Sequence, residues 1–119
     1  MYQIPKELDL SPVVGEFTTQ VRVGQFDIQF TFGKVSFAVQ SKVLLKRDRK
    51  EIGRWEEGTW PNPTFYEIMN TKVNSFEIIG SSKIVLKFEN GIEMFLENDS
   101  NHYESMQISI EGDQCLYVI

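Results

Sequence analysis

The residues best suited to chemistry lie in one short stretch, ENDSNHYES, which runs from Glu97 to Ser105. It holds the only histidine of the chain, His102, between Asp99 and Glu104. Carboxylates and an imidazole could bind a metal ion or, with Ser100, could form a nucleophilic triad. The stretch lacks the ligand spacing of a calcium loop. A single histidine and a single cysteine also exclude an all-nitrogen-and-sulfur zinc site within one chain.

The same stretch is also typical of an ordinary polar loop. Three triad members within four residues of one loop would be poorly held, because working triads draw on separate rigid elements. Asp, Asn and Ser are common turn formers. We therefore expect a loop or a partner-binding strand edge here, with no catalytic residue, metal or cofactor. The alternative is a metal-dependent hydrolase that uses this acidic stretch.

A second candidate site is aromatic. Trp55, Trp60, Phe65 and Tyr66 could wall a pocket for a small ligand, or they could cap one end of a β core. A small-ligand-binding protein is therefore a further alternative. The only cysteine, Cys115, has the pattern of a small buried hydrophobe in a strand.

Alternating apolar and polar residues predict that strands dominate. In QFDIQFTF the apolar positions are Phe26, Ile28, Phe30 and Phe32, and a two-residue turn at 33–34 follows. Asn-Gly at 90–91, between SKIVLKF and IEMFLE, predicts a second hairpin. A third hairpin, from MQISI to QCLYVI, would occupy 104–119 and turn at Gly-Asp.

Two Pro-containing helix starts precede the two longer strand runs. Ser11-Pro12 predicts a single turn, and Asn62-Pro63 predicts a short helix over 63–70. VGQFDIQFTF matches IGSSKIVLKF at an offset of 56 residues, which suggests an internal repeat over 11–40 and 62–97. The segment between the copies, 41–61, is expected to be a connector with a short strand near 52–55.

The expected fold class is mainly β, an α+β arrangement with minimal helix, in one domain over 1–119. Each of the two pseudo-repeats would consist of a helical turn and a three-strand antiparallel meander. The repeats would pack as a sandwich or a partly open barrel.

The charge balance excludes some classes of partner. A net charge of −5 disfavours nucleic-acid binding, and no apolar run is long enough to span a membrane. The absence of a signal-like start and the single cysteine favour a cytoplasmic location. After Lys87 the chain has seven acidic and no basic residues. If these acids gather on one exposed edge, they would attract a protein with a basic surface.

Two stretches, VVGEFTTQVRVGQFDIQFTF and LKFENGIEMFLENDSNHYESMQI, resemble a family of small uncharacterised bacterial β-rich domains. That family carries an F-x-(N/D)-G turn and an acidic stretch ending in Y-E-S. Some of its members are encoded beside polymorphic toxins, which implies an immunity role for them. The family has no established catalytic residue, so the resemblance implies none here.

These observations predict a non-catalytic protein-binding domain, not an enzyme, and the resemblance implies an immunity-type protein that neutralises a toxin. We expect a monomer or homodimer that binds no nucleic acid and no membrane. The expected partner-binding residues are Glu93, Glu97, Asp99, His102, Glu104, Trp55 and Trp60.

Overall fold

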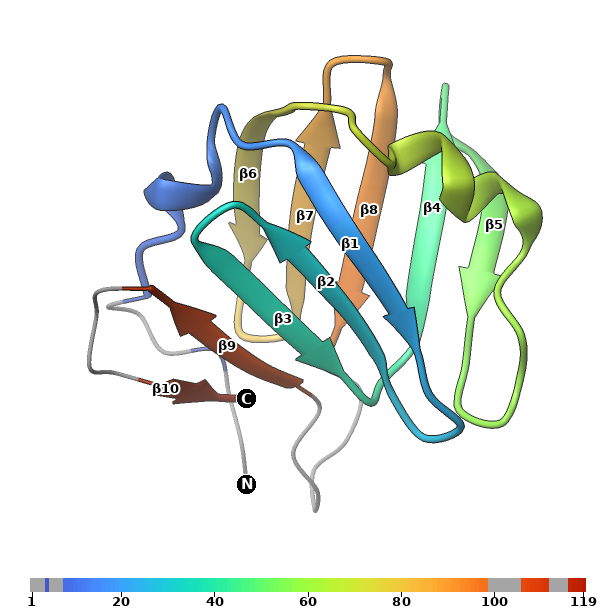
Figure 1. Ribbon diagram of the computed structural model, residues 1–119, viewed down its shortest axis with the longest axis horizontal. Coiled ribbons are helices and arrows are strands. Elements are labelled where there is room, and N and C mark those ends of the chain that lie inside the picture. The colour runs from blue at the N-terminus through green and yellow to red at the C-terminus, as the bar shows by residue number, and fades with distance from the viewer. Residues whose placement is uncertain (1–3, 5–7, 99–105, 112–115) are drawn as a thin grey trace.

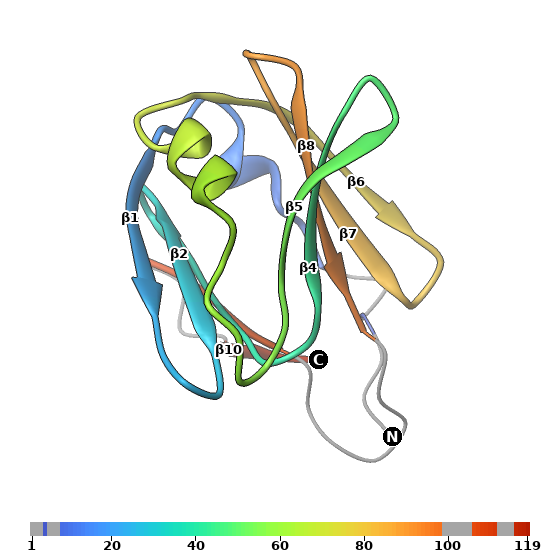
Figure 2. The same cartoon turned by 90° about the vertical axis from the view of Figure 1, so that its right-hand side faces the viewer.

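The computed structural model describes residues 4, 8–98, 106–111 and 116–119. These residues form ten strands and two 3-10 helices, which confirms the mainly β class. Sheet 1 has the order β1-β2-β3-β9-β10, with β1 (Thr18–Val23), β2 (Ile28–Phe32), β3 (Val35–Val39), β9 (Met106–Ile110) and β10 (Leu116–Val118). Sheet 2 has the order β5-β4-β8-β7-β6, with β5 (Lys50–Trp55), β4 (Val43–Arg47), β8 (Ile92–Glu97), β7 (Lys83–Phe88) and β6 (Val73–Ile79). All strand pairs within the sheets are antiparallel, and the two sheets face each other in Figures 1 and 2.

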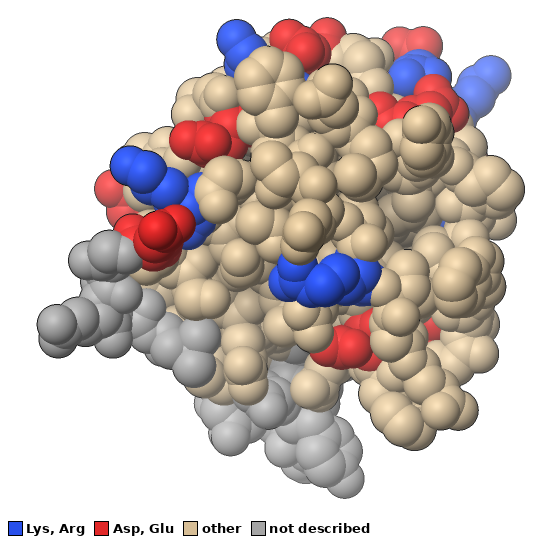
Figure 3. Space-filling view, in the orientation of Figure 1, with Lys and Arg blue, Asp and Glu red and all other residues tan. Residues whose placement is uncertain are grey.

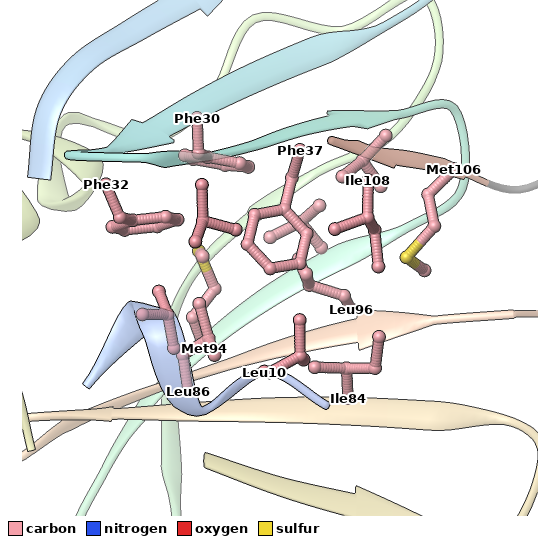
Figure 4. Close-up of a cluster of buried hydrophobic side chains, with 14 of the residues drawn as sticks. Leu10, Phe30, Phe32, Phe37, Ile84, Leu86, Met94, Leu96, Met106 and Ile108 are labelled. Carbon is pink, nitrogen blue, oxygen red and sulfur yellow. The ribbon is translucent and has the colours of Figure 1, made fainter. Parts of the chain in front are cut away.

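The hydrophobic core lies between the two sheets. In Figure 4, Phe30, Phe32 and Phe37 of sheet 1 point toward Leu86 and Met94 of sheet 2. Each of these side chains is buried. The alternating pattern produces this core, because every second residue of an extended strand faces the same side. Full burial of one such side chain stabilises the fold by about 1.5–3 kcal/mol.

The strands of all three predicted hairpins pair antiparallel, and the turn of the third lies outside the described residues. Phe32 pairs with Val35, so Gly33-Lys34 forms the turn, and Gly33 has a φ of 58°. Glycine meets this requirement without a steric cost. The Asn-Gly hairpin is also present, and its loop has three residues. It spans 89–91 and is closed by the bond from the N–H of Gly91 to the carbonyl of Phe88 (3.1 Å).

Three details differ from the sequence-based expectation. The expected connector, 41–61, contains both β4 and β5. The short strand expected near 52–55 is the end of β5, whereas β4 was not expected. A register shift between Leu45 and Lys46 places an extra residue, Ile52, in β5 and interrupts its period-two pattern. Phe26 lies before β2, with 63% of its surface exposed. The predicted helix over 63–70 is a shorter 3-10 helix, η2 (Pro63–Ile68), and the first turn is η1 (Ser11–Val13).

The two halves of the chain exchange hairpins. β4 and β5 follow β3 in sequence but pair with β8 in sheet 2, where Val43 lies opposite Leu96. β9 and β10 follow β8 in sequence but belong to sheet 1, where Met106 lies opposite Val39. Each sheet therefore takes three strands from one half of the chain and two from the other.

Backbone bonds join the sheets at the corner where β1 and β6 begin, and these bonds come in equivalent pairs. The N–H of Gly15 donates to Val73 (2.8 Å), and the N–H of Asn70 donates to Thr18 (2.9 Å). Likewise, Val73 donates to the carbonyl of Glu16 (2.9 Å), and Thr18 donates to that of Thr71 (3.1 Å). Every pair is related by the same offset of 55 residues, and an isolated bridge between Phe17 and Lys72 lies between them.

Candidate functional site

The candidate site is a groove between the edge strand β1 and the segment 60–69, on the side of the molecule where η2 lies between β1 and β5 (Figure 2). We call it the aromatic groove. Its volume is about 390 Å³. Its lining consists mainly of apolar and aromatic side chains, together with Asn62 and two prolines. These lining residues are Val21, Val23, Trp60, Pro61, Pro63, Phe65, Tyr66 and Met69. No charged residue lines it.

Side chain to backbone hydrogen bonds dock η2 onto β5. The carbonyl oxygen of the Asn62 side chain accepts a bond from the N–H of Arg54 (2.7 Å), and the Thr64 hydroxyl donates to the carbonyl of Ile52 (2.7 Å). Asn62 was expected to cap the helix, but it makes no side-chain cap bond and instead ties η2 to the sheet. Gly53 makes this close approach possible, because an added Cβ would collide with the Thr64 hydroxyl.

A three-residue period of buried side chains along η2 creates the wall of the groove, since Phe65 and Ile68 are buried. Phe65 turns inward and stacks on Phe30, with ring centroids 6.4 Å apart. The next residue, Tyr66, turns outward with 81% of its surface exposed. A short 3-10 turn, with three residues per turn, places neighbouring side chains on different faces.

A tight turn at 56–59 positions the second exposed aromatic residue. The Thr59 hydroxyl donates to the carbonyl of Glu56 (2.7 Å), and the N–H of Gly58 donates to Gln25 in the β1–β2 loop (2.9 Å). Trp60 follows directly, and 80% of its surface is exposed. Trp60 and Val23 also line a second hollow, which extends the groove toward the β1–β2 loop.

The backbone of β1 faces the groove at two positions. Pairs in an antiparallel ladder alternate between hydrogen-bonded and non-bonded. Because the N–H of Gly24 bonds the carbonyl of Asp27 (2.8 Å), the pairs Val23–Ile28 and Val21–Phe30 are of the non-bonded kind. The N–H and C=O groups of Val21 and Val23 therefore point away from β2, toward the groove.

The outer face of sheet 1 carries little charge, as the broad uncharged area in Figure 3 shows. Among its described outward-facing strand residues, Arg22 is the only charged one. The guanidinium donates to neutral acceptors, including the side-chain oxygen of Gln29 (3.1 Å) and the hydroxyl of Thr31 (3.4 Å). No ion pair to Arg22 is present in the described part of the chain.

The two tryptophans predicted for the site have different surroundings. Trp60 meets Phe65 and Tyr66 at the groove, whereas Trp55 is fully buried in the core at the end of β5. Of the two alternatives for this aromatic group, Trp55 therefore belongs to the core, and only Trp60, Phe65 and Tyr66 line the groove. Val21 and Val23 could not be recognised as site residues from sequence, because a half-buried edge strand has the same alternation as any other strand, and Met69 has the spacing of an ordinary core residue of the predicted helix.

The acidic residues that the structure describes do not form an edge. Glu93 and Glu97 lie on β8, the central strand of sheet 2, so the expected edge position is wrong for both. Glu97 lies between two lysines, 3.5 Å from the Nζ of Lys42 and 3.9 Å from that of Lys83. Glu93 is paired in register with Lys46 and Lys87. Lysines of both halves of the chain thus flank acids that seemed isolated in the sequence.

The remaining predicted site residues, Asp99, His102 and Glu104, lie outside the described residues, as does Cys115. Among the residues described, no group of three or more His, Cys, Asp or Glu side chains is placed to hold a metal ion. Nor does the described part of the chain contain a helix long and apolar enough to cross a membrane.

One carboxylate near the groove has a shifted pKa. The guanidinium of Arg54, whose backbone holds Asn62, donates two bonds to Glu51 (2.9 and 3.2 Å). This hydrogen bonding lowers the pKa of Glu51 and raises that of Arg54. The pair is exposed, so it orders the outer surface of β5 rather than supplying a reactive group.

Comparisons of the chain with protein-family models, curated proteins and solved structures find no match.

Proposed function

We propose that this protein is a non-catalytic protein-binding domain and that its binding surface is the aromatic groove. The observation that carries the proposal is the exposure of Trp60 and Tyr66 beside an uncharged apolar groove. Aromatic residues are enriched and charged residues are depleted at the centres of protein interfaces. Trp and Tyr are also the residues whose truncation most often weakens binding.

A small-ligand-binding protein is the second candidate, favoured by the groove volume of about 390 Å³. This lies within the range of about 300–1,000 Å³ that is usual for ligand sites. A protein partner agrees better with Trp60 and Tyr66, because most of the surface of each of these residues is exposed.

Site-specific photo-crosslinking in the source cells tests the proposal. A photoreactive amino acid at position 66 should give a discrete protein adduct, and Trp60→Ala should abolish that adduct. The matched control position is Glu77, which is exposed on the opposite sheet. Equal adducts from both positions, or no protein adduct at position 66, would contradict protein binding at the groove.

We also propose that the partner protein has a basic surface around the part that contacts the aromatic groove. The net charge of −5 supports it, because opposite net charges speed the encounter of two proteins. The screening length falls from about 10 Å at 0.1 M salt to about 3 Å at 1 M. The association rate with the crosslinked partner should therefore fall as salt rises, and a rate independent of salt would contradict this charge assignment.

An immunity-type role in the cytoplasm is the biological setting that we propose for such binding, on the basis of the sequence resemblance. Where a toxin gene adjoins the gene for this protein, co-expression should protect cells from the toxin. Trp60→Ala with Tyr66→Ala should remove the protection while the protein remains folded. Full protection by the double variant would exclude the groove as the toxin-binding surface.

We also propose that the fold is a sandwich of two duplicated units, about 11–55 and 63–119, each of one 3-10 helix and five strands. The bonds shared at an offset of 55 residues support it, as do Gly15 and Asn70, which both adopt a left-handed conformation after their helices. Each unit is longer than the meander predicted from sequence, because the exchanged hairpins belong to it.

A further inference from the structure

We infer that the occupant of the aromatic groove is an extended segment of the partner, which adds to sheet 1 as a strand alongside β1. This inference rests on the proposed function and specifies the form of the ligand. It combines three features of the groove and its rim: a free strand edge, an uncharged apolar lining and an arginine that forms no ion pair within the described part of the chain.

The first feature is the free edge of β1. β1 is the terminal strand of sheet 1, and the N–H and C=O groups of Val21 and Val23 point toward the groove. Within the described chain, no backbone bond joins these groups to any other segment. An extended peptide supplies donors and acceptors with the matching two-residue repeat.

The free edge has a defined length. Bonds from the Thr18 and Asn70 amides close it at one end, and the bond from Gly58 to Gln25 closes it at the other. The open part is the five residues 19–23. At about 3.3 Å per residue, it spans about 17 Å and accommodates about five residues of a partner strand.

The second feature selects the side chains of the partner strand that point inward. Alternate residues of that strand would face the groove, where they meet Val21, Val23, Trp60 and Tyr66. A charged side chain would lose hydration there without gaining a partner. The inward positions should therefore be aliphatic or aromatic.

The third feature selects a residue on the opposite side of the partner strand. Arg22 projects from β1 onto the outer face, where its own hydrogen bonds go to neutral acceptors, and one of these, the side chain of Gln29, donates in turn to Asp27 (2.9 Å). A carboxylate in the partner strand beside it would form a cross-strand ion pair, which directly opposed opposite charges favour. The predicted motif is apolar–acidic–apolar, within a partner whose remaining surface is basic.

The test uses a display library of random twelve-residue linear peptides, selected on the full chain. Enriched peptides should carry the apolar–acidic–apolar motif. Trp60→Ala should weaken their binding about tenfold or more, as expected for an interface anchor. Phe26→Ala, another exposed aromatic residue but outside the groove lining, should leave binding unchanged. Arg22→Gln should weaken binding only of the peptides that carry the acid.

Backbone N-methylation of an enriched peptide separates strand addition from other modes of binding. Methylation of every second amide should weaken binding about tenfold, because each lost bond leaves a backbone group unsatisfied, and methylation of the intervening amides should have little effect. The Val21 and Val23 amides should also exchange hydrogen more slowly in the complex. Binding that needs Trp60 but lacks the two-residue methylation pattern would overturn strand addition and leave protein binding at the groove intact. Failure to enrich any Trp60-dependent peptide would overturn strand addition as well, whereas the crosslinking experiment decides the groove independently.

Discussion

At the scale of single residues, the two halves of the chain use different residues, Gly15 and Asn70, for the same left-handed backbone conformation. Gly15 and Asn70 both follow a 3-10 helix and have φ values of 88° and 55°. Glycine adopts this left-handed conformation freely, and asparagine tolerates it better than most residues. Both positions lead the chain from a helix into the first strand of a meander.

We predict that Gly15→Ala destabilises the protein by about 1–2 kcal/mol. An added Cβ would meet no atom within 4 Å, so the whole loss comes from backbone conformation. Asn70→Ala should cost a similar amount, whereas Asn70→Gly should stay within about 0.5 kcal/mol of the natural protein. Urea denaturation measures the stability of all three variants. A Gly15→Ala variant with an unchanged urea midpoint would contradict the left-handed conformation at position 15.

The ion pair between Glu51 and Arg54 gives a prediction about pH. Because the pKa of Glu51 is lowered in the folded state, the stabilisation by its carboxylate is fully present above the unfolded pKa and is lost as pH falls through the folded value. Arg54→Gln should raise the pKa of Glu51, as followed by NMR titration of the carboxyl carbon. Lys87→Gln, on a distant strand, should not change it. An unchanged pKa in Arg54→Gln would show that the two hydrogen bonds do not persist in solution.

At the scale of elements, the context of a strand decides what its charges do. Glu93 and Glu97 belong to the acidic end of the sequence, yet β8 lies between β4 and β7, which supply lysines on both sides. The Nζ of Lys46 also lies over the ring of Phe95, 4.6 Å from its centre. These contacts favour the packing of sheet 2 and reduce the net charge of its outer face.

The close contact between β5 and η2 gives a prediction at this scale. Gly53→Ala should destabilise the protein by about 1–3 kcal/mol, because the new methyl group forces apart a tightly packed strand and helix. The change should also weaken binding at the groove, since η2 carries Tyr66. Circular dichroism during thermal unfolding measures the first effect, and peptide binding measures the second.

A double variant identifies the contact responsible. Thr64→Ala removes the hydroxyl that the new methyl group would strike, so its combination with Gly53→Ala should lose less stability than the sum of the single losses. Strictly additive losses would mean that the cost of Gly53→Ala arises elsewhere.

At the scale of the whole molecule, the exchanged hairpins make each half depend on the other. β9 continues sheet 1 beside β3 and brings Met106 and Ile108 into the core, where Ile119 is also buried. β4 continues sheet 2 beside β8 in the same manner. The core is accordingly one cluster built from both halves.

We predict that a chain ending at Asn98 does not fold, because it lacks four buried core residues of the C-terminal segment, Met106, Ile108, Ile110 and Ile119. At about 1.5–3 kcal/mol each, their loss rivals the whole stability of a typical domain, about 5–15 kcal/mol. The near-ultraviolet circular dichroism of the buried Trp55 should be lost and should return when a 99–119 peptide is added. Cooperative unfolding of the truncated chain alone would contradict this interdependence.

The sequence determined those features that depend on neighbouring residues. Alternation predicted the β class and the buried faces, Gly33 and Asn90-Gly91 predicted two hairpins, and Asn62-Pro63 predicted where η2 begins. Each of these signals acts within a few residues, so it needs no knowledge of the rest of the chain.

Only the tertiary structure decided which elements become neighbours. An alternating pattern shows which side of a strand is apolar, but it does not show which strand lies beside it. The exchange of hairpins and the lysines around Glu97 could therefore not be predicted from sequence. Trp55 and Trp60 are the same residue type and lie five residues apart, yet Trp55 is buried in the core and Trp60 is exposed to solvent. The difference arises because β5 ends at Trp55 and the turn that follows leads Trp60 out to the edge of β1.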